Sequence, residues 1–175
     1  MSIEEEQNSE DLYADIDFDE EDKDDIELKD AKFIAETPKT VKKKENKEEK
    51  LSQFFNDEDK LIGEKIIQKK SGEIIEIKYD PLGHKEGVLY KNKDKFLKKA
   101  VDYYANGSIK MVTEYEKNGG YKSLMYNADG SRQSFVEKHP DGTADAVYYD
   151  ADAKGTTMYM KLDKNKNLIE KRFER

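Results

Sequence analysis

The chain of 175 residues is long enough for one domain of ordinary size, and 41% of its residues are charged against 35% hydrophobic. It contains no cysteine, which excludes a disulfide, a thiolate nucleophile and a cysteine metal site. No apolar run is long enough for a transmembrane helix or for the core of a signal peptide, so we expect a cytoplasmic protein.

The formal net charge of −8 is concentrated near the N-terminus. Residues 1–30 hold 15 acidic residues and two lysines, whereas the remaining residues have a net charge of +5. This composition predicts a disordered acidic arm, because it cannot bury enough apolar surface to offset the entropy of ordering. The arm is either a solubilising tail or a linear motif that docks on a basic, apolar groove. The motif would bind its partner through Leu12, Tyr13, Ile16 and Phe18.

The sign of the charge changes after residue 30. Three lysines at 42–44 follow Pro38, a pattern typical of a solvated linker, so residues 1–47 are predicted to be the acidic arm and a Lys-rich linker. Residues 48–60 are predicted to be a short helix or a linker. Within them Leu51, Phe54 and Phe55 share one helical face at spacings of i, i+3 and i+4.

The spacing of Leu51, Phe54 and Phe55 also resembles the sliding-clamp-binding box, in which a glutamine precedes an aliphatic residue and two aromatic residues. Glu48 occupies the position of that glutamine. The resemblance implies a nucleic-acid-associated partner, whereas the simpler interpretation is a helical turn packed on the edge of the domain.

From residue 61 onwards a short phrase recurs, in which an aromatic residue or histidine is followed three or four residues later by glycine. The glycines at 107, 119, 130 and 142 are spaced by 12, 11 and 12 residues. Tyr104, Tyr115 and Tyr126 belong to this phrase, and an Asn or Asp precedes most of the glycines. Turns at this interval between alternating apolar and polar residues predict a mainly β fold, an antiparallel β-meander of about nine short strands over residues 61–175.

Most of the strands are clearly indicated by alternation, but residues 94–104 are ambiguous. That segment can form a helix capped by Asp94 and ended by Gly107, or a strand in phase with its neighbours, and we favour the strand. Both faces of most strands carry only one or two apolar side chains. This pattern favours a thin, repetitive sheet over a sandwich, with the rings packing between strands. The strands are expected near residues 65–70, 73–79, 87–91, 109–115, 121–126, 133–138, 146–149, 157–162 and 169–173.

The segments 104–110 and 126–131 resemble units of variant MORN repeats and of tyrosine–aspartate repeats, over about residues 79–162. The chain departs from standard MORN units because it has no Trp. The resemblance implies a protein-interaction or shell scaffold and carries no catalytic residue to transfer.

The sequence offers no catalytic constellation. His84 and His139 both lie beside turn residues, and no phosphate-binding loop or nucleophile elbow is present. The acidic residues around Asp163 lack the glycine and the closing glutamate of a calcium loop. We therefore expect no enzyme, no cofactor and no metal.

The leading hypothesis is a protein-interaction scaffold that uses a Tyr-rich sheet surface, with the acidic arm as a second contact. The alternative is a nucleic-acid-associated protein, because the body beyond residue 30 is slightly basic and rich in aromatic residues. No membrane contact is expected. The two open edges of a meander also allow pairing between copies of the chain.

Overall fold

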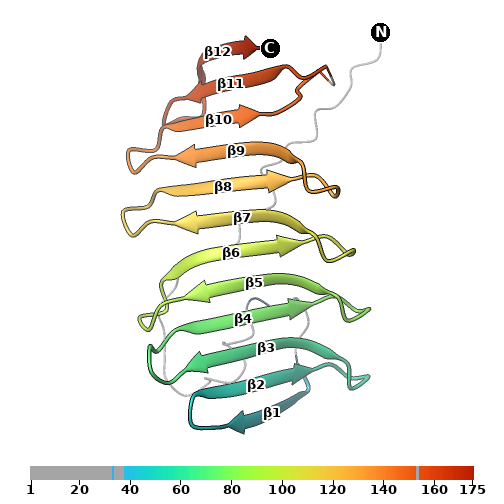
Figure 1. Ribbon diagram of the computed structural model, residues 1–175. Helices are drawn as coiled ribbons and strands as arrows, with labels where there is room; N and C mark the ends of the chain where they lie inside the picture. The colour runs from blue at the N-terminus through green and yellow to red at the C-terminus, as the bar shows by residue number, and fades with distance from the viewer. Residues whose placement is uncertain (1–32, 34–37, 153) are drawn as a thin grey trace.

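A computed structural model describes residue 33 and residues 38–152 and 154–175 of the chain. Every element in these residues is a β-strand, and the strands form one antiparallel sheet in chain order (Figure 1). This confirms the predicted fold class, an antiparallel β-meander, while the predicted acidic arm lies outside the described residues. The strands are β1 (Thr40–Glu45), β2 (Glu49–Phe55), β3 (Leu61–Gln68), β4 (Ile74–Tyr79), β5 (Lys85–Lys91), β6 (Leu97–Tyr103), β7 (Ile109–Tyr115), β8 (Tyr121–Tyr126), β9 (Arg132–Lys138), β10 (Ala144–Tyr148), β11 (Thr157–Leu162) and β12 (Leu168–Glu174).

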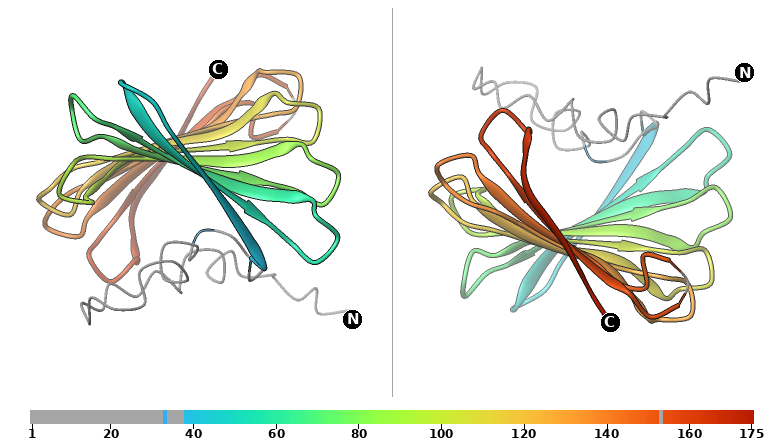
Figure 2. Two further views of the ribbon diagram at one scale, coloured as in Figure 1. Left: turned by 90° about the horizontal axis from the view of Figure 1, so that it is seen from below. Right: turned by 90° about the horizontal axis from the view of Figure 1, so that it is seen from above.

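The sheet is a single twisted layer, and β1 and β12 cross steeply when the molecule is viewed along the sheet (Figure 2). None of the described side chains is completely buried. Apolar side chains pack instead in rows across the strands, as in the row that joins Val88, Val101 and Val112. Such cross-strand pairs are the main source of stability in a sheet without a second layer. The buried hydrophobic residues are Phe54, Ile62, Ile74, Val88, Val101, Met111 and Ala146.

One five-residue turn recurs along the sheet. The first residue donates its N–H to the carbonyl of the fifth, and the fourth donates to the carbonyl of the first, at N···O distances of 2.8–3.1 Å. The fourth residue has positive φ in each of these turns, as in hairpin loops that end with a left-handed residue. The turns begin at Asn56, Asp80, Asn92, Tyr104, Glu116, Asn127, His139 and Asp163.

An Asn or Asp side chain closes each of these turns, in one of two ways. In four turns the Oδ1 of the first residue accepts the N–H groups of the third and fifth residues, as Asn56 does at 3.0 Å from Glu58 and Lys60; these turns begin at Asn56, Asp80, Asn92 and Asp163. Otherwise the third residue accepts from the fifth, as Asn106 does at 3.0 Å from Ser108. The three turns of this set with a non-glycine fourth residue, at Asp59, Lys95 and Lys166, all begin with Asn or Asp. An Asn or Asp side chain that accepts two backbone N–H groups is therefore present in every turn of this set whose left-handed residue is not glycine, where the backbone is more strained.

Four predictions are corrected or resolved by these strands. The predicted short helix or linker over residues 48–60 is wrong, because Glu49–Phe55 is β2 and pairs along its length with β1 and β3. Part of the predicted Lys-rich linker, Thr40–Glu45, is β1. The ambiguous segment contains β6, a strand as favoured. Ten strands, rather than nine, lie between residues 61 and 175.

Candidate functional site

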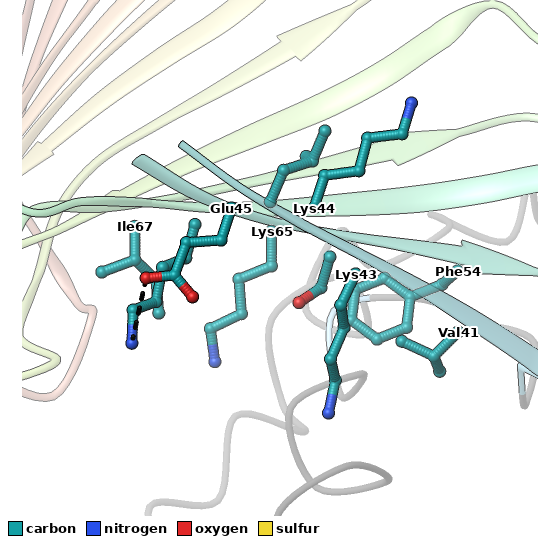
Figure 3. Close-up of a pocket in the computed structure, with 10 residues that line it drawn as sticks. Val41, Lys43, Lys44, Glu45, Phe54, Lys65 and Ile67 are labelled. Atoms are coloured by element: carbon teal, nitrogen blue, oxygen red, sulfur yellow. Dashed lines mark ion pairs between the residues drawn. The ribbon is translucent and has the colours of Figure 1, made fainter. Parts of the chain in front are cut away.

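A shallow basic pocket lies at the β1 end of the sheet, with a volume of about 510 Å³ (Figure 3). Three strands build it, and four of its ten lining residues are lysines, against one glutamate. We call it the β1–β3 pocket. Its lining residues are Val41, Lys43, Lys44, Glu45, Lys50, Leu51, Ser52, Phe54, Lys65 and Ile67.

The strand register arranges the pocket in three rows across β1, β2 and β3. The first row is apolar and joins Val41, Phe54 and Gly63; the second joins Lys43, Ser52 and Lys65; the third joins Glu45, Lys50 and Ile67. Directly opposed residues share a face of the sheet, so these side chains project from the same side. Figure 3 shows Lys43 and Lys65 extending to one side of the strands and Lys44 to the other.

Phe54 forms the floor of the apolar row and is only 3% exposed. Its opposite residue on β3, Gly63, has no side chain, which leaves room for the ring above the backbone. The aromatic ring and the glycine thus complement each other across the strand pair, and the pocket has an apolar end beside its lysine row.

Glu45, the one acidic group among the described lining residues, already has partners. The Glu45 carboxylate lies 2.6 Å from Lys69 Nζ and 4.0 Å from Lys50 Nζ. The hydrogen bond from Lys69, with the nearby charge of Lys50, holds the pKa of Glu45 below its ordinary value. Glu45 is therefore ionised at neutral pH, and the surplus of lysines over this one carboxylate leaves the pocket with positive formal charge.

Lys65 is unusual among the pocket lysines because it is only 8% exposed. It lies opposite Glu76 of β4, which is 7% exposed and whose carboxylate contacts Lys91 Nζ at 2.7 Å. The second row of the pocket therefore contains one nearly buried lysine, Lys65, and one exposed lysine on the edge strand, Lys43.

Leu51, Phe54 and Phe55 were predicted to share one helical face, but in the strand β2 they do not share a face. Side chains alternate along β2, so Phe54 lies on one face and Leu51 and Phe55 lie on the other, and of the three, Leu51 and Phe54 line the pocket. The Lys42 ammonium lies 4.5 Å from the centroid of the Phe55 ring, in a cation–π contact. The geometry that the sliding-clamp box requires, three apolar residues on one helical face, is absent from this segment.

The three predicted tyrosines do not form one surface. Tyr104 and Tyr126 lie at the same end of the strands, where the Tyr104 hydroxyl donates to the Tyr126 carbonyl at 2.8 Å. Tyr115 lies at the opposite end, and its ring centroid is 6.2 Å from that of Tyr121. All three side chains are half-buried. The Tyr115–Tyr121 ring contact joins the paired strands β7 and β8, whereas the Tyr104 hydrogen bond joins two successive turns at one end of the sheet.

Tyr115 also lines a second hollow, of about 720 Å³, over the turns of β5 to β8. Its lysines are largely matched by acids, with Lys99 Nζ 3.7 Å from Glu114 and Lys98 Nζ 3.5 Å from Glu73. A hollow with balanced charge offers little electrostatic selectivity. The β1–β3 pocket is the stronger candidate because its described lining has four lysines and one acid, against four lysines and three acids in the second hollow.

The four predicted contact residues of the arm, Leu12, Tyr13, Ile16 and Phe18, lie outside the described residues. Phe33 is described, and its ring lies over Gly87 of β5, where an added Cβ would meet Phe33 Cζ at 3.1 Å. The register joins Gly63, Lys78 and Gly87 in one row, so Phe33 contacts the same face that carries the pocket. This contact depends on the absence of a side chain at Gly87.

The remaining candidates for chemistry are isolated. His139 Nε2 lies 2.7 Å from Asp145 Oδ2, and this hydrogen bond raises the pKa of His139. His84 Nδ1 lies 3.0 Å from Asp80 Oδ2 in another turn. Within the described ranges, no group of three or more His, Cys, Asp or Glu side chains is placed to hold a metal ion. Nor does that part of the chain contain a helix able to cross a membrane.

Sequence reasoning missed Val41, Lys43, Lys65 and Ile67 as site residues. The first two lay in the predicted linker, and the burial of Lys65 becomes visible only when β3 is paired with β4. No protein-family model matches the chain, and no curated protein matches it. The resemblance to MORN-like and tyrosine–aspartate repeats stays a prediction.

Proposed function

We propose that this protein is a non-enzymatic interaction module whose β1–β3 pocket binds acidic peptide segments that carry aromatic or aliphatic side chains. The observation that carries the proposal is the lysine row formed by Lys43 and Lys65 next to the apolar row of Val41 and Phe54. Carboxylates would contact the ammonium groups, and the apolar side chains would lie on Val41, Ile67 and the lysine stems.

A peptide suits this pocket better than a nucleic acid. Proteins that bind single strands stack the bases on exposed aromatic rings, and the aromatic ring within the pocket, Phe54, is 3% exposed. Lysines alone would hold phosphates without a stacking platform. Nucleic-acid binding remains the alternative function, and it predicts a steep loss of affinity with added salt.

The pocket also suggests a different role for the acidic arm. Residues 10–20 contain six acidic residues together with Leu12, Tyr13, Ile16 and Phe18, the chemistry that the pocket fits. A tethered segment acts at a high effective concentration, on the order of millimolar for a short flexible connection. We therefore propose that the arm competes with a partner's peptide for the pocket, rather than adding a second contact.

The test uses a fluorescent peptide with the sequence of residues 10–20, titrated with the full chain and with a chain lacking residues 1–32. Deletion should leave β1 intact, because β1 begins at Thr40. We expect a dissociation constant on the order of tens of micromolar for the shortened chain, typical of a short segment that orders on binding, and weaker binding by the full chain.

The matched control compares two neighbouring lysines of β1. Lys43→Glu reverses a charge inside the pocket and should weaken peptide binding by about tenfold or more, whereas Lys42→Glu reverses a charge on the other face and should change it little. Equal affinities of the two variants would remove the pocket from the proposal. Tighter binding of an oligonucleotide than of the peptide would favour the nucleic-acid alternative.

A further inference from the structure

We propose that β12 is a self-association edge: it pairs antiparallel with β12 of a second copy of the chain, about a two-fold axis at Lys171. β12 is the last strand of the sheet, and all seven of its residues are exposed. In the described part of the chain it pairs with β11 on one side, and its outer backbone groups face no other strand. Such an edge is a template for another strand.

Three of the seven side chains of β12 are large, apolar and exposed, and the other four are charged. Leu168 is 52% exposed, Ile169 is 59% exposed and Phe173 is 58% exposed. Together they account for three of the six large exposed hydrophobic side chains among the described residues. Natural sheets usually place charged residues on edges to prevent pairing. The concentration of apolar surface on this strand therefore points to a partner that covers it.

The sequence of β12 is complementary to itself in one register. Two copies centred on Lys171 place Ile169 opposite Phe173 and Glu170 opposite Arg172, each twice by symmetry, and leave Leu168 opposite Glu174 as the one unmatched pair. Opposite charges and apolar side chains directly across from each other both stabilise an antiparallel pair. All of these contacts come from a single seven-residue strand.

The neighbouring registers are much poorer. A two-fold axis normal to the sheet keeps opposed residues on one face only when it passes through a residue, because side chains alternate between faces. An axis at Glu170 would oppose two glutamates. An axis at Arg172 would oppose two arginines and would also place Glu170 opposite Glu174. Like charges directly opposite each other destabilise a pair, so Lys171 is the favoured centre.

The proposed axis brings two Lys171 side chains together, and the structure shows how their charges separate. Lys171 Nζ lies 5.2 Å from the centroid of the Phe173 ring of its own strand. Each ammonium is thus drawn along its strand and away from the axis. On the other face, Arg172 lies 4.6 Å from the Tyr159 ring centroid, which holds the guanidinium above the sheet where Glu170 of the second copy would approach.

The first test exploits the symmetry with two charge-reversal variants of the full chain, Glu170→Arg and Arg172→Glu. Each variant alone opposes like charges twice and should self-associate at least about tenfold more weakly than the original chain in sedimentation equilibrium. An equimolar mixture should associate, because every arginine then faces a glutamate of the other variant. A mixture that stays as monomeric as its components would overturn the proposal.

The second test uses the absence of cysteine from the chain. In the proposed register the Lys171→Cys chain should form a disulfide-linked dimer under mild oxidation, since directly opposed Cα atoms lie within disulfide range. The Lys42→Cys chain, with its thiol on the edge strand β1, should crosslink much more slowly. Equal rates, or open-ended assemblies of the original chain as expected for β12 on β1, would contradict the register.

This inference is independent of the proposed function. The β1–β3 pocket and β12 lie at opposite ends of the sheet (Figure 1). The Lys43→Glu variant should therefore keep the sedimentation behaviour of the original chain, and the Arg172→Glu variant should keep its peptide affinity. If the peptide-binding experiment fails, the self-association proposal stands, and if the sedimentation experiment fails, the peptide-binding proposal stands.

Discussion

The two end strands of the sheet, β1 and β12, have the same structural position and opposite surface chemistry. Among the described strands, each pairs with one neighbour. β1 carries three lysines and only one aliphatic residue, Val41, and it covers the nearly buried Phe54 of β2. β12 carries exposed Leu168, Ile169 and Phe173 beside a self-complementary charge pattern.

The contrast shows that an edge strand can be used in two ways. Lysines on β1 oppose pairing with a further strand, so this end of the sheet is free to present its face, and the β1–β3 pocket lies there. On β12 the apolar residues and the matched charges favour pairing, so the backbone edge is the binding element. One end thus offers side chains to a ligand, and the other offers a strand to a second copy.

The largest expected difference between the ends is in stability. Phe54→Ala should lower the free energy of unfolding by about 3 kcal/mol, because it removes a nearly buried ring and leaves a void above Gly63. Phe173→Ala, at a residue 58% exposed, should change it by less than about 0.5 kcal/mol at concentrations where the chain is monomeric.

Urea denaturation of both variants at low protein concentration measures this difference. At high concentration the Phe173→Ala chain should lose more stability than at low concentration, since self-association stabilises the folded state by mass action. Comparable losses for the two variants at low concentration would mean that β12 packs as tightly in the monomer as β2 does.

A smaller difference is expected between turns near the two ends. Asp59, in the turn between β2 and β3, has φ 57°, and Asp59→Gly should stabilise the chain by about 0.5–1 kcal/mol because glycine adopts this conformation without strain. Gly142, between β9 and β10, has φ 90°, and an added Cβ would lie 3.2 Å from Lys164 Cβ. Gly142→Ala should therefore destabilise the chain, by about 1–2 kcal/mol.

Thermal unfolding of these two variants, with Asn56→Ala as a control, tests the role of the turn side chains. Loss of the Asn56 amide removes two hydrogen bonds to the backbone and should cost about 1 kcal/mol. The Asp59→Gly substitution should recover part of that loss. If Gly142→Ala stabilised the chain, the positive φ at this position would not be what limits the stability of the β9–β10 hairpin.

The same turn explains which parts of the fold the sequence could predict. Turns with glycine as the left-handed residue, at Gly107, Gly119, Gly130 and Gly142, are visible as a repeated phrase and predicted the meander correctly. The turn that begins at Asn56 has Asp59 in that position, so its hairpin carries no glycine signal. For this reason β2 was predicted as a helix, and β1 as part of a linker.

The candidate site was less predictable than the fold, for a geometric reason. Leu51 and Phe54 were identified from their apolar character, but the pocket depends on the register that brings Lys43 of β1 and Lys65 of β3 to opposite sides of Ser52. Register follows from the hairpin turns that the glycine pattern did not reveal. The three tyrosines recur in the sequence at successive turns, and successive turns of a meander alternate between the two ends of the strands, so Tyr115 lies at the end opposite Tyr104 and Tyr126.

The smallest expected difference between the ends is in their dependence on pH. In the folded chain the hydrogen bond to Asp145 raises the pKa of His139 above its unfolded value of about 6.5. Its contribution to stability is therefore present below the unfolded pKa and is lost as pH rises through the folded one. The hydrogen bond to Lys69 lowers the pKa of Glu45 below its unfolded value of about 4.5, so its contribution is present above that value and is lost as pH falls.

Two amide variants separate these contributions. The stability difference between the original chain and His139→Gln should shrink as pH rises above the folded pKa of His139, whereas the difference for Glu45→Gln should shrink below about pH 4.5. The Glu45 side chain is exposed and the His139 side chain is half-buried, so salt should weaken both effects, and that of Glu45 more. Denaturation midpoints across the pH range measure the differences, and NMR titration of the His139 ring gives its pKa directly. A His139 pKa at or below its ordinary value would show that the Asp145 contact does not persist in solution, and the β9–β10 hairpin would then be held by its backbone and by Asp141 alone.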